Sequence, residues 1–152
     1  MSYAVNTSVP VERSKAEIES LLMRYGAQEF FSGHRSGLAV VGFEMRNRRV
    51  QFVVPLPSRE SEEFTHTGVR GLRRDTTSAF RAWERACRQR WRALALVIKA
   101  KLEAVERGIT EFDSEFLAHF VLPNGSTIGQ VMKPKMDRLC ATGDLPPLLP
   151  GE

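Results

Sequence analysis

One amphipathic stretch decides the fold: residues 75–109, which read DTTSAFRAWERACRQRWRALALVIKAKLEAVERGI. Large apolar residues recur in it at steps of three or four, a spacing that places them on one face of an α-helix. These positions are Phe80, Trp83, Cys87, Trp91, Leu94, Ile98, Leu102, Val105 and Ile109. Asp75 or Thr76 can cap the start. The helix would be about 45 Å long, more than one small sheet needs. We therefore expect its far end to cross a neighbouring subunit or to carry the C-terminal region.

Three short runs rich in Phe and Val precede this helix and predict a three-stranded antiparallel meander. They cover residues 28–32, 38–45 and 49–56. A loop with two glycines at 33–37 and a turn centred on Asn47 separate them. The second run is apolar on both faces, which predicts that it is the central strand.

Shorter helices are predicted on both sides of these elements. Ser14 and Glu17 match a capping box, so a helix is expected over residues 14–25. After Gly108 the pattern predicts a small helical cap, in which Thr127 starts the last short helix and Pro134 limits it. The predicted fold class is therefore α+β, with an N-terminal helix, a three-stranded meander, one long helix and a small C-terminal helical cap. The predicted domain organisation is an arm at 1–13, one domain at 14–140 with a long polar loop at 58–74, and a proline-rich tail at 141–152.

The composition excludes several classes of protein. The chain has 152 residues, of which 42% are hydrophobic and 26% charged, as in one ordinary globular domain. Its longest apolar run, 94–98, is far shorter than the ~20 residues that a membrane span needs. The first residues lack the pattern of a secretory signal. Cys87 and Cys140 lie far apart without metal-ligand spacing, so reduced thiols and a cytoplasmic location are expected.

Positive charge is concentrated in one segment. The whole chain carries 22 Lys and Arg against 18 Asp and Glu, for a net charge of +4. Residues 70–101 contain ten basic residues opposed only by Asp75 and Glu84, so ten positive charges minus two negative ones give +8. A concentration of this kind favours a polyanion or an acidic protein as partner.

Five of these basic residues predict a second stripe on the long helix, about 100° from its apolar face. They are Arg81, Arg85, Arg88, Arg92 and Lys99, and neighbours one turn apart would match the spacing of phosphates on a nucleic-acid strand. The predicted nucleic-acid-binding set also includes Arg46, Arg48 and Arg49 at the hairpin tip and Arg70, Arg73 and Arg74 in the loop before the helix. The alternative is an ordinary solvated face. The scarcity of glutamates four residues away favours binding, whereas Trp83 and Trp91 lie in the apolar stripe and are expected in the core.

Catalytic chemistry finds little support in the sequence. His34, His66 and His119 are scattered, and no glycine-rich phosphate loop occurs. An acidic cluster of Glu111, Asp113 and Glu115, with Asp137, could bind a divalent cation, but acids at a helix start are also explained by the helix dipole. We predict no enzyme activity, no cofactor and no metal site. An enzyme with an unrecognised site is the remaining option.

Two segments carry a resemblance to known proteins. Residues 88–103, RQRWRALALVIKAKLE, and the ending 145–150, LPPLLP, resemble small uncharacterised proteins encoded by phages and integrated mobile elements. The order of three antiparallel strands and a long helix is similar to the core of phage single-strand annealing proteins. That similarity of layout implies a role in recombination or replication and transfers no residue.

Two hypotheses for function follow. The first is a non-enzymatic protein, homo-oligomeric, that binds the DNA backbone, with single-stranded DNA favoured, through the arginine stripe and the hairpin tip. The second is a protein-interaction module, such as a phage accessory or inhibitor protein. In that case the arginine stripe and the proline-rich tail would bind an acidic partner, for example a host protein. Neither hypothesis requires a membrane.

Overall fold

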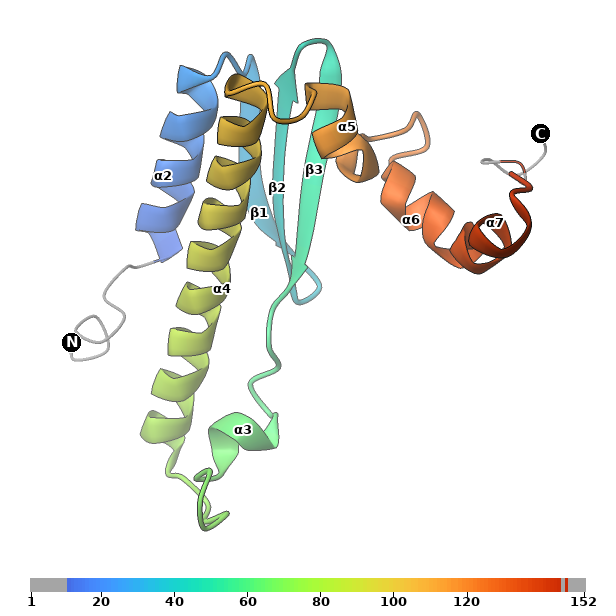
Figure 1. Ribbon diagram of the computed structural model, residues 1–152. Coiled ribbons are helices and arrows are strands. Elements are labelled where there is room, and N and C mark those ends of the chain that lie inside the picture. The colour runs from blue at the N-terminus through green and yellow to red at the C-terminus, as the bar shows by residue number, and fades with distance from the viewer. Residues whose placement is uncertain (1–10, 146, 148–152) are drawn as a thin grey trace.

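The computed structural model describes residues 11–145 and 147 and has the predicted α+β fold (Figure 1). Two helices, α2 (Val11–Arg24) and α4 (Thr76–Glu106), lie side by side on one face of a three-stranded sheet. The strands are β1 (Glu29–Arg35), β2 (Leu38–Met45) and β3 (Arg48–Pro55). The remaining helices are short: α3 (Glu62–Thr65), α5 (Phe112–Phe116), η1 (Leu117–His119), α6 (Ile128–Met132), η2 (Lys133–Lys135) and α7 (Met136–Thr142). None of the described helices has the length and apolar character of a membrane span.

The sheet is an antiparallel meander in the order β1-β2-β3, which confirms β2 as the central strand. Each hairpin closes through a two-residue turn whose residues have positive φ. These are Ser36 (48°) and Gly37 (78°) in the first turn, and Arg46 (52°) and Asn47 (64°) in the second. Turns of this hand match the twist of the strands. The predicted loop at 33–37 is wrong, because the turn needs only two residues and β1 continues to Arg35.

Helix α2 begins at Val11, three residues before the predicted cap. Ser14 is therefore an interior residue. It is fully buried, and its hydroxyl has no hydrogen-bond partner among the described residues. The predicted capping box is wrong, and the predicted arm at 1–13 overlaps the helix at its last three residues. Residues 1–10 lie outside the described part of the chain.

Helix α4 provides one wall of the core. Its start is capped as predicted, since the Asp75 carboxylate accepts a hydrogen bond from the backbone N–H of Ser78 at 2.7 Å. Trp91, Ile98 and Leu102 are almost fully buried between α4, α2 and the sheet. The predicted apolar stripe fails at Ile109, which lies beyond the helix and is 77% exposed.

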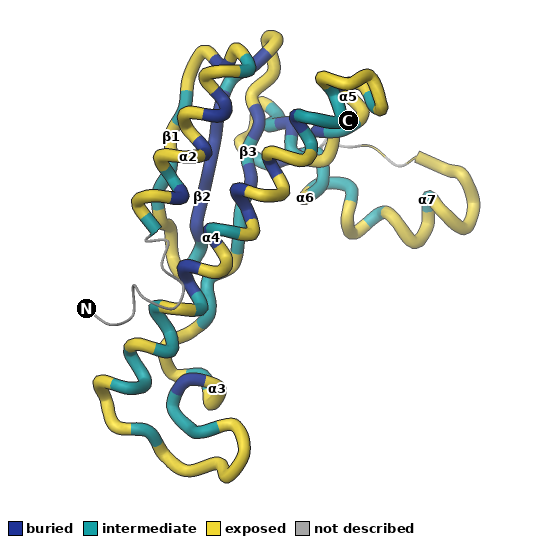
Figure 2. Tube along the Cα trace, turned by 60° about the vertical axis from the view of Figure 1, so that its left-hand side comes forward, coloured by how far each residue is buried: buried dark blue, intermediate teal, exposed yellow. Residues whose placement is uncertain are grey.

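The first turns of α4 project past the end of the sheet (Figure 2). The chain from Pro57 to Arg74 returns beside them, and its helix α3 packs on α4 through the buried Phe64. A β-bridge between His66 and Arg73 closes the rest of the segment. The long polar segment is thus partly helical and packs against the projecting end of α4. The C-terminal region follows the opposite end of that helix.

The C-terminal region packs against the β3 edge through phenylalanines. Phe116 is fully buried and meets Phe43 and Phe52 edge to face. Thr127 starts α6, as the sequence predicts, and its side chain also forms a capping box with Gln130. Helix α7, which the sequence pattern does not predict, extends into the predicted tail. Most of that tail, residues 146 and 148–152, lies outside the described residues.

Candidate nucleic-acid interface

Helix α2 interrupts the predicted arginine stripe on α4. Arg88 is only 3% exposed and lines a cavity beside Trp91, so it does not belong to an exposed stripe. Arg92 donates to the Glu17 carboxylate of α2 at 2.7 Å. The predicted stripe lies about 100° around α4 from its apolar face. Along this part of α4, that side of the helix packs against α2. The stripe is therefore not one continuous exposed surface.

The hairpin tip is used within the fold. Arg48 donates two hydrogen bonds to Asp113, at 3.2 and 2.9 Å, and its guanidinium lies 5.5 Å from the Phe120 ring. This contact raises the pKa of Arg48, and the hydrogen bond from Arg48 holds the pKa of Asp113 below its usual value. Arg46 lies over the ring of Phe112 at 5.2 Å. Arg46 and Arg48 thus tie the hairpin to the C-terminal region.

Arg49 and Lys99 are exposed but isolated from the other predicted residues. Arg49 is cross-strand neighbour to Glu44, which offsets its charge. Lys99 lies more than three turns along α4 from Arg85, near Arg24 of α2. Neither residue joins the loop arginines.

Five arginines gather at the projecting end of the molecule, which we call the basic end: Arg70, Arg73, Arg74, Arg81 and Arg85. Arg81 and Arg85 lie one turn apart on α4, and both are exposed. The backbone N–H of Arg74 donates to the Thr65 carbonyl at 2.7 Å, which holds the loop arginines to α3. None of the five makes an ion pair within residues 11–145.

Two hollows at the basic end are lined both by the segment before α4 and by α4 itself. Arg74 and Arg85 line one of about 390 Å³, together with Phe64. Arg73 and Arg74 line a second of about 420 Å³. Arg59, which the sequence analysis missed, lines the second hollow and covers the Phe80 ring at 4.7 Å. No sequence signal marks Arg59, because it stands alone among polar residues and only the fold brings it to α4.

Acidic residues lie in the same segment as the loop arginines. Glu60, Glu62 and Glu63 belong to α3 or precede it, and Glu62 and Glu63 occupy its first turn. The basic end therefore places its arginines next to the acidic first turn of α3. Glu63 also lines the hollow of Arg74 and Arg85, and Glu60 and Glu62 line that of Arg73 and Arg74, so these carboxylates offset part of the positive charge.

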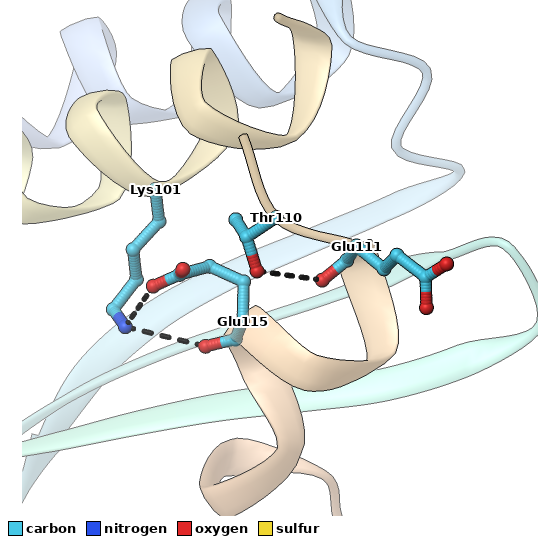
Figure 3. Close-up of polar contacts among 4 residues, drawn as sticks. All are labelled: Lys101, Thr110, Glu111 and Glu115. Carbon is cyan, nitrogen blue, oxygen red and sulfur yellow. Dashed lines mark hydrogen bonds and ion pairs between the residues drawn. The ribbon is translucent and has the colours of Figure 1, made fainter. Parts of the chain in front are cut away.

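The acidic cluster of the C-terminal region is divided between different cations (Figure 3). Glu115 accepts from the Lys101 ammonium at 2.9 Å through its carboxylate and at 3.3 Å through its carbonyl. Asp113 binds Arg48, while the Glu111 carbonyl accepts from the Thr110 hydroxyl at 3.5 Å. No group of three metal-ligating side chains occurs in the part of the chain that the structure describes.

A cavity of about 820 Å³ lies between the start of α2, the β1–β2 turn and α4. Trp91 is 1% exposed, which confirms its place in the core, and Lys15 lies 5.0 Å above its ring. The Trp83 indole N–H donates to the Pro57 carbonyl at 2.7 Å. Both tryptophans therefore pack within the fold. Three cations and three carboxylates line the cavity, so its charge selects no single class of ligand: Lys15, Arg59, Arg88, Glu12, Glu60 and Glu84.

The pKa of His119 is lowered from its usual value. Burial against Phe52, on which its ring stacks at 4.0 Å, is the main cause, and the charge of Lys101 adds to it. Because the folded state holds this proton less tightly than the unfolded state, the contribution of His119 to stability is fully present above about pH 6.5. It should fall as the pH drops towards the lowered pKa.

We expect His119→Phe to reduce the loss of unfolding free energy between about pH 7.5 and about pH 5.5, measured by urea denaturation. An unchanged pH dependence in this variant would contradict the assignment.

Comparisons with protein-family models, curated proteins and solved structures found no significant match. The similarity to phage single-strand annealing proteins and to mobile-element proteins therefore stays a prediction from the sequence.

Proposed function

We propose that this protein binds the sugar-phosphate backbone of a nucleic acid, with single-stranded DNA favoured, through the basic end. The supporting observation is that arginines from two separate segments gather at one projecting end and make no ion pair within residues 11–145. Guanidinium groups of this kind fork onto phosphate oxygens. Contacts of this type recognise the backbone rather than the base sequence.

The interface is smaller than the sequence suggests. It excludes Arg88, which is buried, as well as Arg48 and Arg92, which bind carboxylates of this chain. If four arginines of the basic end each met a phosphate of a single strand, the logarithm of the affinity would fall with the logarithm of salt at a slope of roughly −3.

The double variant Arg81→Glu/Arg85→Glu tests this proposal. Both residues are exposed on α4 and neither makes an ion pair within residues 11–145, so the fold should survive. We expect fluorescence anisotropy with a labelled single-stranded oligonucleotide to show at least about tenfold weaker binding. The salt slope should be shallower by about 1.4 for two lost phosphate contacts. Titrations from about 50 to 400 mM salt give both quantities.

A matched control separates the basic end from net charge. Arg107→Glu/Lys133→Glu changes the net charge by the same amount at exposed positions far from the basic end. It should bind nearly as tightly as the wild type. Equal loss in both double variants, or no binding by the wild type at low salt, would overturn the proposal. The latter result would favour an acidic protein as partner.

A further inference from the structure

Strand β1 is an open edge of the sheet. The other edge strand, β3, is partly covered, since the backbone N–H of Val121 donates to the Arg49 carbonyl at 2.8 Å and Val50 forms a bridge with Phe120. Within the described residues no backbone segment pairs with the outer side of β1. An edge strand presents free N–H and C=O groups that can pair with another strand.

The sequence of β1, EFFSGHR, lacks two residues that often block edge pairing. It has no proline and no lysine, and its register with β2 is continuous over all seven residues. The two-residue turn makes Arg35 and Leu38 a hydrogen-bonded pair, and such pairs alternate along an antiparallel ladder. The backbone groups of Phe30, Ser32 and His34 consequently point to the open edge.

Two charges in β1, those of Glu29 and Arg35, have no ion-pair partner within residues 11–145. Glu29 lies directly opposite Glu44 of β2, and like charges in that position repel each other. At the other end of the strand Arg35 is exposed and lies opposite Leu38.

We propose that β1 pairs antiparallel with β1 of a second copy of this chain, with Ser32 facing Ser32 across the two-fold axis. This register places Glu29 of each copy opposite Arg35 of the other, and it pairs all seven residues of both strands. It agrees with the alternation of hydrogen bonds, since the outward groups of Ser32 then meet each other.

The apolar side of the strand fits the same register. Phe31 is 48% exposed and crosses Gly42 of its own sheet, where a Cβ would collide with its ring. In the proposed pair Phe31 lies opposite Gly33 of the second copy, so it meets glycine on both sides. Shifting the two-fold axis to Phe31 or Gly33 would lose both ion pairs, so charge and shape select one register.

Exchanging the charges of the exposed residues Glu29 and Arg35 tests this interface with variants that should stay folded. Light scattering after size exclusion, in reducing buffer at roughly 1–100 µM protein, should give the wild type twice the 17.2 kDa mass of one chain. We expect Arg35→Glu to raise the dimer dissociation constant at least about tenfold, because it places two pairs of like charges across the axis. The double variant Glu29→Arg/Arg35→Glu should restore the dimer to within about threefold.

Two further variants complete the test. Ser32→Pro removes an outward N–H that β2 does not use, so it should give a folded monomer. Arg13→Glu makes the same charge change as Arg35→Glu at an exposed position on α2 and should remain a dimer. A wild type that stays monomeric at every concentration would overturn the proposal. So would a double variant no better paired than Arg35→Glu. The proposal does not depend on nucleic-acid binding, which anisotropy measures separately.

Discussion

Replacing Phe116 by alanine should lower the free energy of unfolding by about 3–5 kcal/mol, a large part of what a domain of this size has. Phe116 is fully buried and lies at the centre of an aromatic cluster. Its ring meets Phe43 at 6.1 Å and Phe52 at 6.3 Å, both nearly perpendicular, and Phe112 at 5.0 Å. Alanine would leave a cavity that these three rigid rings cannot fill.

The neighbouring Leu117 provides the control for this variant. It follows Phe116 directly in the chain but is 52% exposed, so Leu117→Ala should cost less than about 1 kcal/mol. Urea denaturation followed by circular dichroism measures both. If Phe116→Ala lost no more stability than Leu117→Ala, the aromatic cluster would not be what joins the C-terminal region to the sheet.

Local chemistry made most of the fold predictable. The 3.6-residue period of α4, the Phe- and Val-rich runs of the strands and the helix start at Thr127 each depend on residues close in the sequence, and all three are confirmed. Positive φ at Asn47 likewise follows from the residue type. Element boundaries were less predictable. Ser14 has the spacing of a cap, yet the same spacing occurs inside α2, where the packing of α2 on α4 buries it.

The candidate site was less predictable because it depends on which surfaces meet. The helical period gives the angle of Arg92 on α4, but the ion pair with Glu17 joins residues 75 positions apart. The same is true of Arg48 and Asp113, which are 65 positions apart. Charge counts along the sequence treat all these arginines alike. Only the fold separates those that bind within the chain from the five of the basic end.

The second large effect is expected at Arg88, which the sequence places in the same stripe as Arg85. Arg88→Glu should lower the free energy of unfolding by about 3–5 kcal/mol, because it puts a shorter group of opposite charge at a site that is 3% exposed. Arg85→Glu, one turn away and exposed, should change stability by no more than about 0.5 kcal/mol. Urea denaturation of the two variants, which carry the same change in net charge, gives the comparison.

Oligonucleotide binding should depend on Arg85 and not on Arg88, which is the reverse of the expected effects on stability. Arg85→Glu should weaken binding while the protein stays folded, since Arg85 belongs to the basic end. Arg88→Met retains the apolar stem of the side chain. Because Arg88 lies outside the proposed interface, this variant should bind like the wild type under conditions where it is folded. If Arg88→Met stayed folded but lost binding, phosphate contacts would have to extend along α4 to the cavity beside Trp91. The flank covered by α2 would then have to open when nucleic acid binds.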